Sequence, residues 1–115
     1  MSMTPLHGKK GQVVAFLADG GRIVSLKGKS LAWISGENVY NYTGDHLGWW
    51  ADGFLLGPDG GVMAWQTREG NRRVNLPHPH PPPTPPLASP EPARPALKDP
   101  PFKPADKLDW SDYTF

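Results

Sequence analysis

Short apolar runs and glycine-containing turns alternate along residues 1–66, and one pattern recurs. A glycine is followed by two variable residues, an aliphatic residue or Met, a tiny residue and an aromatic residue. The aromatic positions are Phe16, Trp33, Trp49 and Trp65. A repeat of about 16 residues is too short for a four-stranded propeller blade and suits a two-stranded hairpin.

Turn signals between these runs divide the first part of the chain into four units. Glycines such as those of Asp19-Gly20-Gly21 supply positive φ at low steric cost. The pattern predicts hairpins over residues 3–17, 22–34, 38–50 and 54–66. Because one hairpin is barely stable in water, we expect the four to bury a shared face around a pseudo-four-fold axis. No run shows an uninterrupted helical period, so the sequence predicts an all-β domain over residues 1–76.

Side chains on a strand point alternately to its two faces, and this separates the repeated residues. Leu31 and Trp33 are expected on one face and Ala32 on the other, and the later copies follow the same rule. The tiny residues are predicted to converge near the axis, namely Ala15, Ala32, Gly48 and Ala64. We expect the repeated aromatics to pack in the core between neighbouring hairpins. The alternative for them is a cation cage or a stacking platform for bases or sugars.

The composition changes abruptly after residue 76. The chain has 15 prolines, and all but Pro5 and Pro58 fall between residues 77 and 104. Proline lacks the backbone donor and fixes φ, so this stretch is predicted to be irregular polyproline II. We interpret residues 77–107 as an extended, Pro-rich linker that reaches away from the domain. The alternative is a ligand for SH3-type domains, because Pro83-Thr84-Pro85-Pro86 has the Pro-x-x-Pro spacing.

The end of the sequence is aromatic again. Trp110, Tyr113 and Phe115 lie within residues 108–115 and are costly to leave in water. The segment is therefore predicted to dock on its own domain, on a second copy or on a partner protein.

Trp50 breaks the repeat because it directly follows Trp49. Since neighbouring residues of a strand face opposite ways, Trp50 is expected on the other face from Trp49. With Tyr40 and Tyr42 it is predicted to form a half-exposed patch for contact with a partner.

Net charge and cysteine content narrow the classes of function. A net charge of +1 with scattered signs gives no broad electrostatic case for nucleic acid or an anionic membrane. The absence of cysteine excludes disulfides, zinc–thiolate sites and thiol chemistry. Because no apolar stretch approaches ~18 residues and the first residues do not resemble a signal peptide, a cytoplasmic protein is expected.

Few residues suggest chemistry. His78 and His80 flank a proline but lack the third ligand that a metal site needs. His46 is interpreted as structural, since the nearby Asp45 and Asp52 occupy turns, where Asp bonds the backbone. No catalytic, cofactor or metal site is predicted. Turn lysines are interpreted as solvated: Lys9, Lys10, Lys27 and Lys29. The alternative is a small basic rim formed by these lysines together with Arg72 and Arg73.

The four copies VVAFL, SLAWI, HLGWW and VMAWQ, each preceded by a glycine turn, resemble the four-fold β-flower family. The stretch GDHLGWW-ADG and the number of hairpins add to the resemblance, which covers about residues 3–67. It implies four β-hairpins around a pseudo-four-fold axis in a bacterial protein, and no established activity. Pro58 departs from the pattern, and a proline there is expected at an edge or strand end.

Three hypotheses for function follow. The first is a non-enzymatic scaffold or protein-interaction module, whose tail binds a protein partner or a second copy to give a homo-oligomer. The second is a small-ligand-binding domain with an aromatic pocket near the pseudo-axis or beside Trp50. The third, an enzyme, lacks a recognisable catalytic arrangement.

Overall fold

Eight short antiparallel strands form the body of the protein in the computed structural model, which describes residues 3–67, 76–105 and 107–113. The strands are β1 (Met3–His7), β2 (Val13–Ala18), β3 (Arg22–Val24), β4 (Ser30–Ser35), β5 (Asn38–Tyr40), β6 (His46–Ala51), β7 (Phe54–Leu56) and β8 (Val62–Trp65). A single 3-10 turn, η1 (Asp19–Gly21), joins β2 to β3 among the described residues. No helix in the described ranges is long and apolar enough to cross a membrane.

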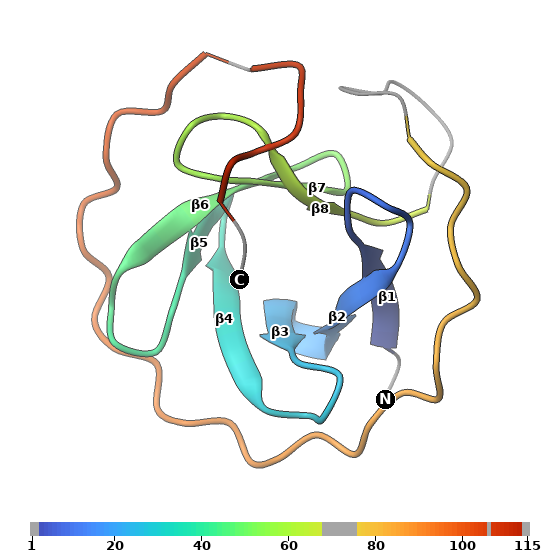
Figure 1. Cartoon of the computed structure of the whole chain (residues 1–115). Helices are drawn as coiled ribbons and strands as arrows, with labels where there is room; N and C mark the ends of the chain where they lie inside the picture. The colour runs from blue at the N-terminus through green and yellow to red at the C-terminus, as the bar shows by residue number, and fades with distance from the viewer. Residues whose placement is uncertain (1–2, 68–75, 106, 114–115) are drawn as a thin grey trace.

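The strands close into a barrel in sequence order, and each pairs with the next. Four hairpins, β1–β2, β3–β4, β5–β6 and β7–β8, surround a central axis with their tips splayed outwards (Figure 1). The predicted all-β fold of four hairpins is therefore confirmed. Closure depends on one backbone pair between β1 and β8, His7 with Trp65. The Trp65 indole reinforces it by donating to the Gly8 carbonyl at 2.9 Å.

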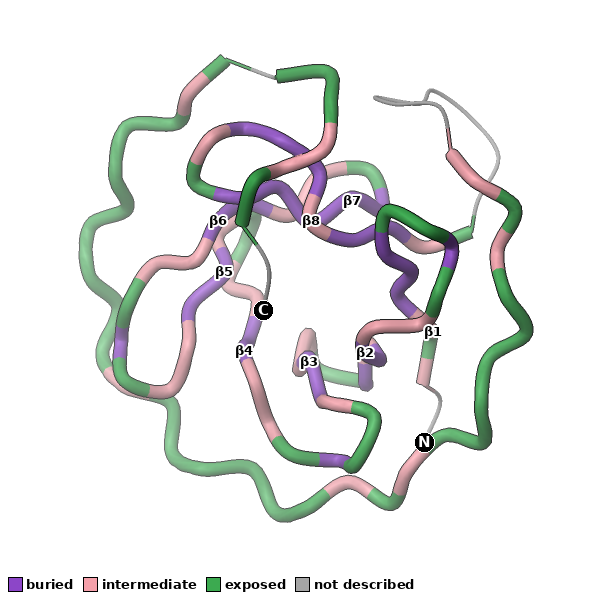
Figure 2. The backbone as a smooth tube through the Cα atoms, viewed as in Figure 1, coloured by how far each residue is buried: buried purple, intermediate pink, exposed green. Residues whose placement is uncertain are grey.

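Large and small side chains alternate round the middle layer of the barrel. The first strand of each hairpin contributes a large aliphatic residue, and the second strand contributes a tiny one directly opposite. The pairs are Leu6 with Ala15, Ile23 with Ala32, Val39 with Gly48, and Leu55 with Ala64. These aliphatic and alanine side chains are buried together (Figure 2). Alternation of this kind fills a narrow barrel without a cavity.

Each hairpin contains a β-bulge near its tip. The bulge places one repeated residue on a different face of the strand from the one that strict alternation predicts. In the second hairpin, Ile23 pairs with Ala32 and Val24 pairs with Ser30, so Leu31 is the extra residue. Leu31 packs against the barrel core beside Ala32. The expectation that Leu31 shares a face with Trp33 is wrong, because a bulge interrupts strict alternation.

All four hairpin tips have the same backbone hydrogen bonds. The first residue of the turn donates to the fifth residue, and the fourth residue, always glycine, donates to the first. These glycines have φ between 79° and 92°, a conformation that other residues adopt at a cost: Gly11, Gly28, Gly44 and Gly60. Pro58 is the second residue of the last turn, where its fixed φ is suitable.

After the barrel, the Pro-rich stretch runs round the outside of the molecule (Figure 1). We call the described residues between 77 and 107 the collar. The collar meets the hairpin tips in chain order, so the polypeptide circles the axis a second time. His80, Ser89 and Lys107 donate their backbone N–H groups to the glycine carbonyls of the first, second and fourth tips. At the third hairpin, the hydroxyl of Tyr40 donates to the Lys98 carbonyl at 2.9 Å.

The contact positions in the collar, 80, 89, 98 and 107, are nine residues apart. The prolines at 77, 86, 95 and 104 precede them with the same period. Two repeats of different length, about 16 residues in the barrel and nine in the collar, therefore stay in register around one axis.

An extended backbone is what lets nine residues cover a quarter turn. At ~3.1 Å per residue in polyproline II, the chain from His80 to Lys107 spans about 84 Å. Three quarters of the circumference of a circle 36 Å across is about 85 Å, so a more compact conformation would fall short. The stretch follows the barrel and does not reach away from the domain as the interpretation as a linker requires.

A cluster of polar contacts fastens the collar between the second and third hairpins. The guanidinium of Arg94 lies 5.2 Å from the centre of the Trp33 ring, donates to the Gly20 carbonyl at 3.0 Å and pairs with Glu91 at 2.9 Å. Glu91 also accepts a hydrogen bond from the hydroxyl of Tyr42. Burial, followed by the bond to Glu91, raises the pKa of Tyr42 to about 12.

Candidate functional site

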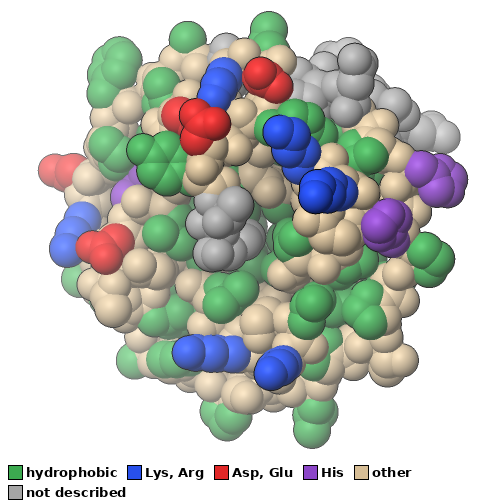
Figure 3. Space-filling model, in the orientation of Figure 1, with side chains coloured by type: hydrophobic (Ala, Val, Ile, Leu, Met, Phe, Trp, Pro, Cys, Tyr) green, Lys and Arg blue, Asp and Glu red, His purple; other side chains and the backbone are tan. Residues whose placement is uncertain are grey.

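The open end of the barrel on the side of the hairpin tips is lined by the four bulged residues. They occupy equivalent positions and pack half-buried against the barrel core: Val14, Leu31, Leu47 and Met63. We call this apolar depression the mouth. Lys and Arg side chains stand in separate groups round its rim, with apolar side chains between them (Figure 3).

The chain re-enters the mouth after the collar, and residues 109–111 pair with the fourth hairpin. Val62 donates its N–H to the Asp109 carbonyl at 2.9 Å, and its own carbonyl accepts from Ser111 N–H at 2.9 Å. Val62 and Trp110 thus form a parallel β-bridge. We call residues 108–113 the tail segment. Leu108, at its start, has φ of 54°, which marks the corner between collar and mouth.

Glycine on the fourth hairpin makes room for this pairing. A Cβ at Gly61 would lie 2.6 Å from the Ser111 Cα and 2.7 Å from its N. The equivalent residue of the other tips carries a side chain: Gln12, Lys29 or Asp45. Only the fourth tip therefore admits an extended segment this close.

Trp110 supplies the apolar contact of the tail segment. Its half-buried indole packs on a cluster formed by the third and fourth hairpins, which also contacts Leu76. The cluster consists of Trp49, Phe54, Leu56, Val62 and Trp65.

Asp59, in the turn of the fourth hairpin, holds the polar side of the tail segment. Its carboxylate accepts from the Ser111 hydroxyl at 2.7 Å and from Asp112 N–H at 3.1 Å. Lys107 Nζ lies 3.4 Å away. Burial acts to raise the pKa of Asp59, but the hydrogen bonds from Ser111, Asp112 and Gly61 outweigh it and hold the pKa well below the usual range. The ionised carboxylate is therefore the form that fastens the tail segment.

His46, on the third hairpin, lines a cavity of about 300 Å³ that Met63 and Tyr113 also line. Its Nε2 is 3.1 Å from the Asn38 side-chain oxygen, and its ring packs edge-on to Tyr40 and Trp49. Burial lowers its pKa, so the neutral imidazole is favoured. In the described part of the chain its hydrogen-bond partner is thus the side-chain amide of Asn38.

The four repeated aromatics are buried on the outer side of the barrel wall: Phe16, Trp33, Trp49 and Trp65. Each lies opposite a residue of the next hairpin, namely Val24, Tyr40, Leu56 or His7. The Trp33 indole also donates to the Asn41 carbonyl of the next tip at 3.3 Å. These side chains fill the seams between hairpins and leave no open cage.

The residues predicted to form one contact patch do not lie together. Tyr40 is 3% exposed, stacks on Trp33 and bonds the collar, and Tyr42 bonds the collar through Glu91. Trp50 pairs with Leu55, so it packs against the barrel core, on the other face from Tyr40. The expectation of a shared patch is wrong, because these side chains differ in strand phase and the collar covers one side.

The remaining predicted contact residues belong to the tail. Trp110 docks as described, and Tyr113 is 53% exposed at the mouth. Phe115 lies outside the described residues. The described residues contain no group of three or more acidic or histidine side chains placed to hold a metal ion, and His78 and His80 lie in the collar.

Sequence reasoning missed three parts of this site. The ring of four bulged residues, which we call the bulged ring, was not predicted because strict alternation was assumed, and Asp59 was not singled out. The collar contacts carried a usable signal, the nine-residue spacing of Pro77, Pro86, Pro95 and Pro104, but the abundance of other prolines obscured it.

Comparison with known proteins gives one match. The family model described as "4-fold beta flower protein" matches residues 4–115, which includes the collar and the tail segment as well as the barrel. Among curated proteins and among solved structures, none matches the chain.

Proposed function

Because the chain belongs to the 4-fold beta flower family, which carries no known enzymatic activity, we propose that it is a non-enzymatic protein-interaction module. Its proposed interaction surface is the face of the fourth hairpin where the tail segment docks. The partner is an extended peptide segment that carries an aromatic side chain.

The observation that carries this proposal is how the tail segment is held. One residue, Val62, uses both its N–H and its carbonyl to pair with an extended chain, while an apolar cluster accepts one indole. Backbone pairing supplies affinity and a side-chain pocket supplies specificity, which is the logic of strand-addition peptide sites. The tail segment is thus a resident example of the ligand.

Two features favour a selective binding site over non-specific apolar binding. Only the fourth tip has a glycine where Ser111 approaches, so the other three hairpins are closed to the same pairing. Asp59 adds a requirement for donors on the two residues after the aromatic one. A partner segment with an aromatic residue, then Ser or Thr, meets these requirements.

A second copy of the chain offers the same chemistry. Every contact of the tail segment in its own mouth can be made in the mouth of a neighbour, and that exchange would give a homo-oligomer. The local segment has the advantage of an effective concentration in the ~mM range. The proposed partner segment therefore competes with the tail segment for the fourth hairpin. When two copies exchange their tail segments, each copy is the partner of the other.

The test is binding of a fluorescent peptide with the sequence of residues 107–113 to full-length variants. In Trp110→Ala the resident tail is weakened, so we expect the peptide to bind at least about tenfold more tightly than it binds the unaltered chain. Gly61→Ala closes the site and should abolish binding. A peptide with Ala in place of its Trp serves as the matched control.

Two results would overturn the proposal: no binding to Trp110→Ala, or binding that Gly61→Ala leaves unchanged. Circular dichroism of each variant establishes that the barrel is intact. Light scattering on the unaltered chain then separates the two forms, because tail exchange gives a mass that rises with concentration and a cis-docked tail gives a constant monomer mass.

A further inference from the structure

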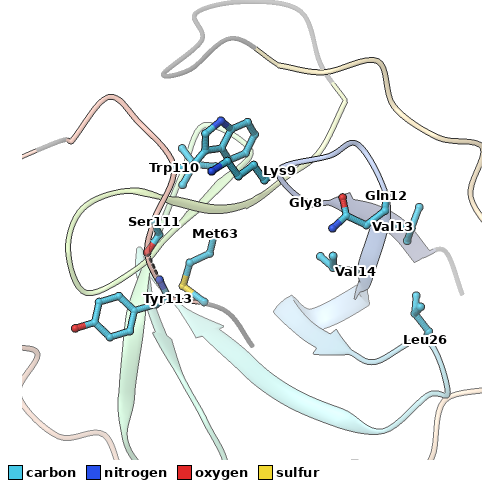
Figure 4. Close-up of a pocket in the computed structure, with 11 residues that line it drawn as sticks. Gly8, Lys9, Gln12, Val13, Val14, Leu26, Met63, Trp110, Ser111 and Tyr113 are labelled. Atoms are coloured by element: carbon cyan, nitrogen blue, oxygen red, sulfur yellow. Dashed lines mark hydrogen bonds between the residues drawn. The ribbon is translucent and has the colours of Figure 1, made fainter.

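A second cavity opens at the mouth between the tail segment and the first two hairpins. It has a volume of about 420 Å³, within the range of small-ligand pockets. Figure 4 shows Val13, Val14 and Leu26 on one side and Met63, Ser111 and Tyr113 on the other. We call it the tail cavity, since the tail segment forms one of its walls.

The walls of the tail cavity are mostly apolar. Val14 and Met63 belong to the bulged ring, and Trp110 contributes the indole of the docked tail. Leu26 is 45% exposed at the tip of the second hairpin. Apolar surface of this kind becomes favourable when a ligand covers it.

The polar groups at the rim are donors. Lys9 makes no ion pair with any residue that the structure describes, and no described residue lining the cavity carries a carboxylate. The Gln12 side-chain oxygen accepts from Lys10 N–H at 3.0 Å, which leaves the amide NH₂ of Gln12 available to donate. A single cationic group and an amide donor from the same hairpin turn complement one negative charge.

We propose that the tail cavity binds a small organic monoanion, a carboxylate or sulfonate on an aromatic or branched aliphatic body. The body lies between Val14, Leu26 and Met63, and the anionic head meets Lys9 and Gln12. A polyphosphate does not suit a cavity with one cation and apolar walls, and a cationic ligand would face Lys9.

This inference goes beyond the proposed interaction with a peptide and couples the two events. The docked indole is a wall of the cavity, so the anion binds the form in which a segment with that indole is in place. By linkage, an anion that favours the docked segment strengthens the docking of that segment by the same factor. The small ligand is then a regulator of the interaction surface.

The test uses 2-naphthoate and its neutral analogue 2-naphthamide, titrated into the full-length protein by calorimetry. We expect saturable one-to-one binding of naphthoate, at least about tenfold tighter than naphthamide, because only the anion gains a charge-assisted hydrogen bond. Lys9→Gln should remove that preference. Lys10→Gln, which alters the neighbouring lysine outside the cavity lining, should keep it.

Location is read from the indole N–H signal of Trp110 in NMR spectra, which should shift with the same saturation curve. Equal affinity for the two probes, a preference that survives Lys9→Gln, or no saturable binding up to mM concentration would each overturn the proposal. These readouts do not involve peptide binding, so their failure is distinct from failure of the peptide experiment.

Discussion

At residue 48 the barrel wall has no room for a methyl group, although the equivalent positions of the other hairpins carry alanine. A Cβ on Gly48 would lie 1.9 Å from the Leu56 carbonyl oxygen, which belongs to the neighbouring strand. The tiny residues of the repeat are therefore alike in size but not interchangeable.

We expect Gly48→Ala to lower the free energy of unfolding by about 3 kcal/mol or more, since the backbone of β7 must move. The reverse change at an equivalent position, Ala32→Gly, should lower it by only about 1–2 kcal/mol through a lost methyl group and added chain entropy. Urea denaturation measures both. If the two variants lose similar amounts of unfolding free energy, the barrel wall does have room for a methyl group at residue 48.

The hydroxyl of Tyr42 gives the collar a dependence on alkaline pH. Its pKa is raised to about 12, so the neutral phenol is the form that the folded protein holds. A raised pKa means that this stabilisation is complete below pH ~10 and is lost as the pH rises from ~10 to ~12.

Amide exchange at these pH values is too fast to follow, so the measurement is the melting temperature from pH 9 to 12. We expect it to fall less steeply for Tyr42→Phe than for the unaltered chain, because the phenylalanine has no proton to lose. Parallel curves for the two proteins would show that Tyr42 does not carry the effect.

Periodicity revealed which residues repeat, and local geometry decided where they point. The positions of Phe16, Trp33, Trp49 and Trp65 follow from the pattern alone, since a fixed spacing places them on equivalent strands. The face of the strand on which Leu31 lies could not be predicted from the repeat. A bulge depends on the tight turn beyond it, and the alternation of apolar residues carries no information about turns.

At the scale of elements, the collar is a repeat built without secondary structure. Each of its units offers one N–H or one carbonyl to a hairpin tip, and proline fills most of the places in between. Some units add side-chain contacts to this bond, as Arg94 does with Gly20 and Trp33, so the backbone bond is tested here in the first unit. A count of prolines predicts an extended chain but does not show whether that chain is free or held.

Two histidines in the first collar unit make a matched pair. His80 donates its N–H to the Gly11 carbonyl at 2.9 Å, whereas His78 N–H has no hydrogen-bond partner among the described residues. Both lie between prolines. We expect His80→Pro to lower the free energy of unfolding by about 1 kcal/mol, the value of one backbone hydrogen bond, and His78→Pro to be nearly neutral.

Thermal unfolding of the two variants measures the difference, and an NMR shift confined to Gly11 and its neighbours locates it. If His78→Pro is as costly as His80→Pro, the collar is held by side chains and not by its periodic backbone bonds.

At the scale of the whole molecule, the barrel and the collar form one folding unit. The collar contacts Trp33, Tyr40 and three hairpin tips, and the tail segment closes the mouth. The core of the barrel alone is narrow, because half of its middle layer is alanine or glycine. A domain of residues 1–76, as the composition suggests, would expose the outer aromatic layer.

We therefore expect a chain that ends at residue 76 to lose its cooperative unfolding transition. A chain that ends at residue 107 keeps the collar and loses the docked tail segment, so its melting temperature should fall by roughly 10 °C. Differential scanning calorimetry distinguishes them. A sharp transition for the shorter chain would show that the barrel folds alone.

The order in which the collar is fastened also sets the response of the molecule to mechanical load. A force applied beyond residue 113 first pulls the tail segment from Val62 and then meets the tips in reverse order, fourth to first. Each detachment frees nine residues, or about 30 Å of extended chain at ~3.3 Å per residue, before the next one bears the load. The molecule would therefore lengthen stepwise under load, and the barrel, which the collar stabilises, would open as the last contacts are lost.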